Sequence, residues 1–155
     1  MGNSCYINSI VQALANFKPV VKFFSQKDLD QSWNQSSKSC GEVASEFSIL
    51  IKDMVSASRF KVVAPRKFKA ILGKYNNIYD TNEQQDGAEL MGDLLRWLAD
   101  DLRRVSVEVG RVYEIHDEEI KVSEEAWKKF KTEDSSFITD TFHGQFRFVN
   151  IHYYN

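Results

Sequence analysis

The chain is poor in residues on which several classes of protein depend. Its 155 residues include only two cysteines, two prolines and three histidines. Two cysteines are too few for a disulfide framework, and no signal peptide or long apolar run accompanies them, so we expect a reducing compartment, cytoplasmic or nuclear, and no membrane association. No His/Cys cluster has complete zinc-ligand spacing and no glycine-rich phosphate loop occurs. We therefore expect no metal site and no cofactor.

The charge balance argues against one class of partner. Twenty Lys and Arg residues against 22 Asp and Glu residues give a formal net charge of −2. Such a chain offers no basic surface to attract phosphate, so we expect no nucleic acid and favour a protein as partner or substrate. With 43% apolar and 27% charged residues, the composition predicts a packed, helix-rich globule of one domain.

A cysteine lies at the start of a predicted helix. Ser4 is suited to cap this helix, and the apolar residues that follow Cys5 recur at the spacing of a buried stripe: Ile7, Ile10, Val11 and Leu14. Asn16 and Pro19 would end it. The free N–H groups of a first helical turn stabilise a thiolate, which makes Cys5 a candidate nucleophile. The alternative is a small buried apolar side chain, as free cysteines commonly are.

Helical periodicity continues along most of the chain. It predicts further helices over residues 20–24, 40–57, 65–72, 85–105 and 124–131, separated by loops at 28–39 and 76–83. Within this scheme Cys40 is a structural residue of a core helix, Gly73 stops the helix that Pro65 opens, and Asp101 belongs to a solvated helix end. Residues 105–120 alternate weakly and could add a strand, and the aromatic, β-branched residues 142–154 predict an exposed strand of a hairpin.

Two segments together resemble the signatures of the ubiquitin-specific proteases. Residues 2–9, Gly-Asn-Ser-Cys-Tyr-Ile-Asn-Ser, followed by Gln-Ala-Leu at 12–14, are similar to the cysteine box of that family. Residues 84–90, Gln-Gln-Asp-Gly-Ala-Glu-Leu, are similar to its second box except at Gly87. Residues 126–127 and 136–144 resemble the family's approach to its fingers. The resemblance thus spans essentially the whole chain.

The resemblance implies an α+β papain-like cysteine protease fold. Residues 1–131 would form a mostly helical thumb-like subdomain, and 132–155 the start of the β fingers. Cys5 would attack the carbonyl after the C-terminal glycine of ubiquitin, so ubiquitin and ubiquitinated proteins are the implied partners. Gln85, Asp86 and Glu89 would line the channel for the extended, arginine-bearing ubiquitin tail. The alternative for Asp86 and Glu89 is stabilisation of a helix N-terminus.

The sequence also departs from the family pattern. A cysteine protease needs a base and a residue that orients it, and the family's Gly-His-Tyr box and the Asp or Asn after it do not occur here. His152 follows Ile151 rather than glycine, and its register places it in the fingers. The position of the family's oxyanion asparagine precedes Met1, and Asn3 does not replace it. We therefore expect an incomplete catalytic domain that is inactive alone. The rival interpretations are a catalytically silent ubiquitin-binding module and a plain helical scaffold with a buried Cys5.

Overall fold

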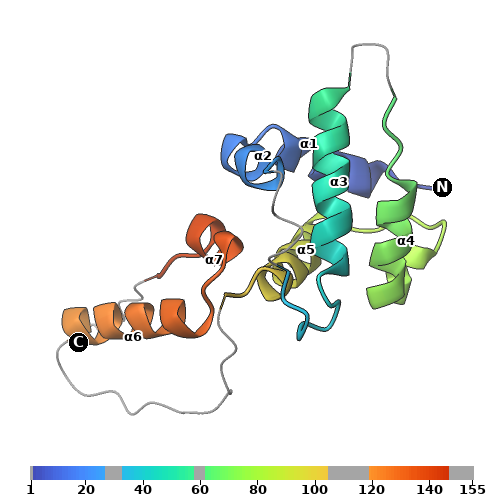
Figure 1. The fold of residues 1–155 in the computed structure, drawn as a ribbon. Coiled ribbons are helices and arrows are strands. Elements are labelled where there is room, and N and C mark those ends of the chain that lie inside the picture. The colour runs from blue at the N-terminus through green and yellow to red at the C-terminus, as the bar shows by residue number, and fades with distance from the viewer. Residues whose placement is uncertain (1, 27–32, 58–61, 105–118, 147–155) are drawn as a thin grey trace, which may run out of the picture.

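The computed structural model describes residues 2–26, 33–57, 62–104 and 119–146 (Figure 1). Its elements follow the chain as α1 (Cys5–Ala15), α2 (Lys18–Phe24), α3 (Glu42–Ser56), α4 (Arg66–Tyr75), the short 3-10 helix η2 (Asn77–Asp80), α5 (Gly87–Asp101), α6 (Glu119–Glu133) and α7 (Phe137–Phe142). These residues contain helices and no strand, which confirms the mostly helical expectation. Of the strands expected at 105–120 and 142–154, residues 105–118 and 147–154 lie outside the described residues, and residues 119–120 belong to α6.

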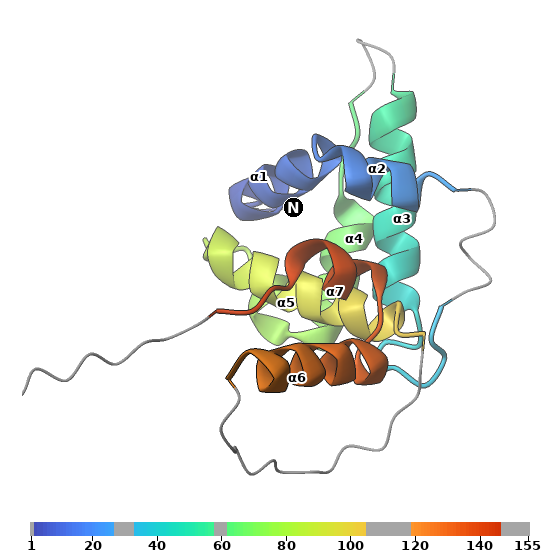
Figure 2. The ribbon, with the colours of Figure 1, turned by 90° about the vertical axis from the view of Figure 1, so that its left-hand side faces the viewer.

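One hydrophobic core holds α1 to α5 and α7 together. Each of these helices contributes buried side chains to the core. Examples are Ile7 of α1, Phe47 of α3, Leu72 of α4 and Leu94 of α5. Helices α1 and α2 lie on one side of the core and α5 on the other, with α3 along their edge and α6 beyond α5 (Figure 2). Because the apolar stripe of α1 points into this core, the opposite face of α1 is left at the surface.

Helix α3 begins two residues later than the sequence predicts. Gly41 is its N-cap residue and has φ 81°, and Cys40 before it also has a positive φ of 50°. A side chain at position 41 would meet Trp33, because a Cβ there would lie 2.4 Å from the Trp33 Cβ. The prediction that Cys40 lies inside a core helix is therefore wrong: Cys40 is an exposed residue of the turn before α3.

Helix α4 does not stop at Gly73 but continues to Tyr75. The glycine serves a close approach, since a Cβ at position 73 would lie 2.9 Å from the Asp80 Cβ and 3.0 Å from its Cα. Asp80 ends η2, an element that the sequence analysis treats as loop. η2 is opened by Asn76, whose side-chain oxygen accepts a 3.3 Å hydrogen bond from the Ile78 N–H.

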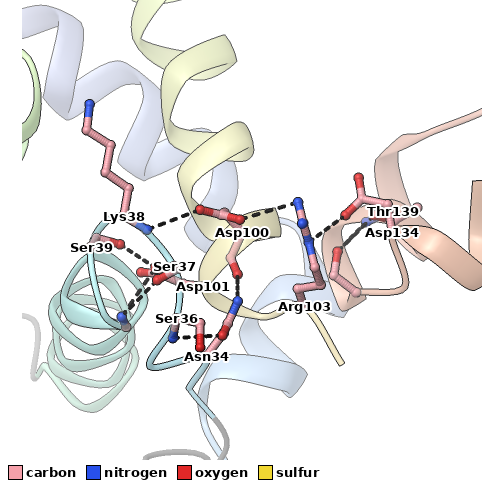
Figure 3. A network of polar contacts seen from close by, with 12 residues as sticks. Asn34, Ser36, Ser37, Lys38, Ser39, Asp100, Asp101, Arg103, Asp134 and Thr139 are labelled. Atoms are coloured by element: carbon pink, nitrogen blue, oxygen red, sulfur yellow. Dashed lines mark hydrogen bonds and ion pairs between the residues drawn. The ribbon is translucent and has the colours of Figure 1, made fainter. Parts of the chain in front are cut away.

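Asp101 at the end of α5 is the clearest departure from the sequence-based expectation. It is fully buried rather than solvated. Its Oδ1 accepts hydrogen bonds from the hydroxyls of Ser37, at 2.6 Å, and Ser39, and from the Gly41 N–H at 3.3 Å, while Oδ2 accepts one from the Ala44 N–H at 3.0 Å (Figure 3). The carboxylate thus supplies the acceptor that the α3 N-terminus needs and that Gly41 lacks.

The C-terminal part of the described chain is more helical than expected. Helix α6 spans Glu119–Glu133, rather than 124–131, and α7 follows it with Ser136 as N-cap, whose Oγ accepts from the Thr139 N–H at 3.0 Å. Phe142 ends α7 and residues 143–146 have no regular structure, so the strand expected from residue 142 does not begin there. The division into thumb and fingers after residue 131 stays a prediction.

Candidate functional site

Cys5 is the first residue of α1 and its side chain is exposed. The two residues after it, Tyr6 and Ile7, are buried at 3% and 0% exposure, and they fix the orientation of the turn that carries the thiol. Ser4 occupies the N-cap position as predicted, although its hydroxyl makes no capping hydrogen bond. The alternative in which Cys5 is a buried apolar side chain is therefore wrong.

The second predicted segment forms the entrance to α5. Asp86 is the N-cap residue, and its Oδ1 accepts a 2.6 Å hydrogen bond from the Ala88 N–H. Glu89 lies in the first turn, and both carboxylates are exposed. Gln85 is half-buried and donates from Nε2 to the Thr81 hydroxyl at 3.3 Å. Asp86 therefore does cap the helix, as the alternative proposed, and its side chain also remains open to solvent.

The starts of α1 and α5 meet, although some eighty residues separate them in the sequence. The Asn3 N–H donates a 3.3 Å hydrogen bond to the Asn82 carbonyl. Gly2, with φ 59°, passes so close to Asn82 that a Cβ would lie 2.4 Å from the Asn82 Oδ1. Gly87 faces α1, since a Cβ there would lie 3.8 Å from the Ser9 Oγ. The structure thus brings together the two segments that the sequence singles out.

Tyr6 connects the turn that carries Cys5 to the interior. Its ring stacks on that of Tyr79 with centroids 6.0 Å apart. Burial, and to a smaller extent the neighbouring Cys5, raise the pKa of the Tyr6 hydroxyl above its ordinary value. This hydroxyl is buried and has no hydrogen-bond partner among the described residues.

The described residues include one histidine, His143, which follows α7 and stacks on Phe130 of α6 with centroids 5.7 Å apart. His116 and His152 lie outside the described residues. In the part of the chain that the structure describes, no group of three or more His, Cys, Asp or Glu side chains could hold a metal ion. None of the helices described is long and apolar enough to cross a membrane.

Comparison with known proteins agrees with this geometry. The family model described as ubiquitin carboxyl-terminal hydrolase matches residues 1–149. Ubiquitin carboxyl-terminal hydrolase 4 of Pongo abelii is 35% identical over 153 residues, which is 95% of this chain and 16% of the relative. Ubiquitin carboxyl-terminal hydrolase 15 of Homo sapiens is 33% identical over 157 residues, 95% of this chain and 15% of the relative. This chain spans about a sixth of the length of these curated relatives. With both predicted segments side by side and the family model matched over nearly every residue, the chain belongs to the ubiquitin carboxyl-terminal hydrolase family.

Proposed function

We propose that this chain is the nucleophile-bearing part of a deubiquitinase with a papain-like thiol mechanism. The observation that carries the proposal is the exposed Cys5 at the start of α1, next to the acidic start of α5. A helix start with free backbone N–H groups is one of the settings in which cysteine nucleophiles occur in proteins. Asp86 and Glu89 offer carboxylates at the neighbouring helix start, where an extended cationic peptide would find charged acceptors.

The reaction is acyl transfer to sulfur. The Cys5 thiolate forms a bond to the carbonyl carbon of the last ubiquitin glycine, the C–N bond breaks, and the amine leaves with a proton. Water then hydrolyses the thioester. The proton transfers need a general base and acid, which the proposal assigns to a part of the protein other than the described residues.

The tail of ubiquitin would lie along the start of α5. Its arginine side chains would pair with Asp86 and Glu89, and its backbone would reach the side-chain amide of Gln85. Ubiquitin and ubiquitinated proteins are then the partners, and we expect the protein to act in the cytosol or nucleus. Cell fractionation followed by detection of the protein tests that location.

A ubiquitin derivative with an electrophile at its C-terminus tests the nucleophile in the full-length protein. We expect one covalent adduct, which Cys5→Ala abolishes and Cys40→Ser leaves intact. Cys40 is the matched control because its side chain is also exposed. Labelling that persists in Cys5→Ala would exclude Cys5 as the nucleophile.

A catalytically silent ubiquitin-binding module is the second candidate. It is favoured by the absence of an assigned base and oxyanion donor among the described residues. Titration with ubiquitin, followed through backbone chemical shifts, separates the two functions. Binding without an adduct supports the module, an adduct supports the enzyme, and neither at high micromolar ubiquitin contradicts both.

A further inference from the structure

Asp93, in the middle of α5, accepts hydrogen bonds from polar side chains of the segment that precedes the second box, residues 84–90. Its Oδ2 accepts hydrogen bonds from the Tyr79 hydroxyl at 3.0 Å and from the Asn76 Nδ2 at 3.1 Å. Its Oδ1 pairs with Arg96 at 2.6 Å. The Asp93 side chain is only 14% exposed, so these donors replace most of its solvation. Asp93 therefore holds both ends of the turn that opens η2.

Tyr79 passes this constraint on to the nucleophile's turn. Its side chain is fully buried, stacks on Tyr6 at 6.0 Å and meets Trp97 edge-on at 6.2 Å. Tyr6 is the residue directly after Cys5. Three residues beyond Tyr79, the Asn82 carbonyl accepts from the Asn3 N–H. Tyr79 thus contacts the turn that carries Cys5. It also belongs to the segment, ending at Asn82, that is hydrogen-bonded to Asn3.

We propose that Asp93 and Tyr79 are positioning residues, a latch that holds the Cys5 turn in register with the start of α5, where the ubiquitin tail would bind. The expected effect on ubiquitin processing rests on the proposed function. The coupling of Asp93 and Tyr79 to the Cys5 turn does not. A phenylalanine at position 79 would fill the same core space. The hydrogen bond between the Tyr79 hydroxyl and the Asp93 carboxylate is therefore the part of the latch that Tyr79→Phe removes.

Loss of the hydrogen bonds to Asp93 should affect the local opening of this segment. Aspartate is a poor residue for a helix interior, and burying its charge is costly unless several donors reach it. A hydrogen bond to a charged acceptor, when lost, corresponds to about a tenfold or greater change in the local opening equilibrium. That opening would separate residues 81–86 from the Gly2–Asn3 segment.

The test uses the full-length protein, and alkylation is read at the peptide that contains Cys5. Tyr79→Phe, Asp93→Leu and the double variant are compared with Ser48→Ala. Ser48 is a matched control because its buried hydroxyl also donates one hydrogen bond, to the Phe24 carbonyl at 3.0 Å, at the contact between α2 and α3. The measurements are amide hydrogen exchange at residues 81–88, the rate of Cys5 alkylation by iodoacetamide, labelling by the ubiquitin electrophile, and the urea midpoint.

We expect Tyr79→Phe and Asp93→Leu to speed amide exchange at residues 81–88 about tenfold and to slow ubiquitin labelling severalfold. Ser48→Ala should lower the urea midpoint by a similar amount but change neither the exchange nor the labelling. The double variant should be no worse than Asp93→Leu, because it leaves no unpaired hydroxyl at Tyr79. Unchanged exchange, or the same local change in Ser48→Ala, overturns the latch. If even the unaltered protein resists the ubiquitin electrophile, the proposed function fails, whereas amide exchange at residues 81–88 still decides for or against the latch.

Discussion

The Oδ2 of Asp101, the last residue of α5, accepts a 3.0 Å hydrogen bond from the backbone N–H of Ala44 in the first turn of α3. A helix N-terminus requires acceptors for its free N–H groups, and the N-cap residue of α3, Gly41, has no side chain to offer one. The acceptor comes instead from the far end of another helix. The buried carboxylate of Asp101 thus connects the end of α5 to the start of α3.

Asp101→Ala should be strongly destabilising. It leaves the hydroxyls of Ser37 and Ser39 and the Ala44 N–H without their acceptor, and it leaves the Gly41 N–H with only the Ser37 Oγ, at 3.3 Å. We expect a loss of about 3 kcal/mol or more in the free energy of unfolding, measured by urea denaturation.

The neighbouring Asp100 provides the control. Its side chain is 35% exposed and pairs with Arg103 at 3.3 Å (Figure 3). Asp100→Ala should cost less than about 1 kcal/mol, because partly exposed ion pairs contribute little. Equal losses for the two variants would show that the acceptor role of Asp101 does not stabilise the fold.

Asp100 and Asp101 also show where sequence-based prediction ends. The apolar stripes of α1 and α5 are local patterns, and both were predicted with the nucleophile at the start of one and the acidic segment at the start of the other. Which of two adjacent aspartates is buried depends on a loop some sixty residues away. The predictions at Gly73 and η2 are wrong for a different reason: Asp80 is near in the sequence, but its close approach to α4 leaves no recognisable pattern of residue types.

Gly87→Ala should stabilise the protein. Gly87 is the first residue of α5, and a Cβ there would lie 3.7 Å from the Ile10 Cδ1 and 3.8 Å from the Ser9 Oγ, which is ordinary contact. Alanine loses less backbone entropy than glycine on entering a helix, so we expect a gain of about 0.5–1 kcal/mol in the free energy of unfolding. The check is the urea midpoint at unchanged slope. A loss of stability would mean that the contact between α1 and α5 is tighter than the structure shows.

Gly73→Ala should have the opposite sign, although Gly73 is also helical. A Cβ there would lie 3.0 Å from the Asp80 Cα and 3.1 Å from its N, and backbone atoms cannot move aside cheaply. We expect a loss of about 1–3 kcal/mol in the same denaturation experiment, because η2 would be displaced from α4. Stabilisation by this substitution would contradict the close approach.

Tyr79 should make the fold sensitive to alkali. Burial raises the pKa of its hydroxyl well above the ordinary value, and the hydrogen bond to Asp93 adds to the effect. The unfolded chain releases this proton at about pH 10, whereas the folded chain retains it, so stability is intact below that pH and falls as the pH rises above it. Urea midpoints between about pH 9 and 11 should fall less steeply for Tyr79→Phe than for the unaltered protein. Identical slopes would contradict the buried, bonded hydroxyl.

Asp86 has a structural role and a proposed binding role, and two substitutions separate them. Asparagine caps helices about as well as aspartate, whereas alanine does not. Asp86→Asn should therefore keep the Ala88 N–H bonded and leave the urea midpoint nearly unchanged, while Asp86→Ala should lose about 1 kcal/mol. Both variants remove the charge that we propose binds the ubiquitin tail.

If that charge contacts an arginine of the tail, both variants should slow labelling of Cys5 by the ubiquitin electrophile to a similar extent, and the deficit should shrink at high salt because screening weakens the contact in the unaltered protein. Cys5 alkylation by iodoacetamide, which carries no tail, reports whether the reactivity of the Cys5 thiol itself has changed. Slower ubiquitin labelling in Asp86→Ala alone would assign Asp86 to capping only. Slower labelling in Asp86→Asn, at unaltered stability and unaltered alkylation, can arise only from lost recognition of ubiquitin, because the helix and the thiol are then both intact.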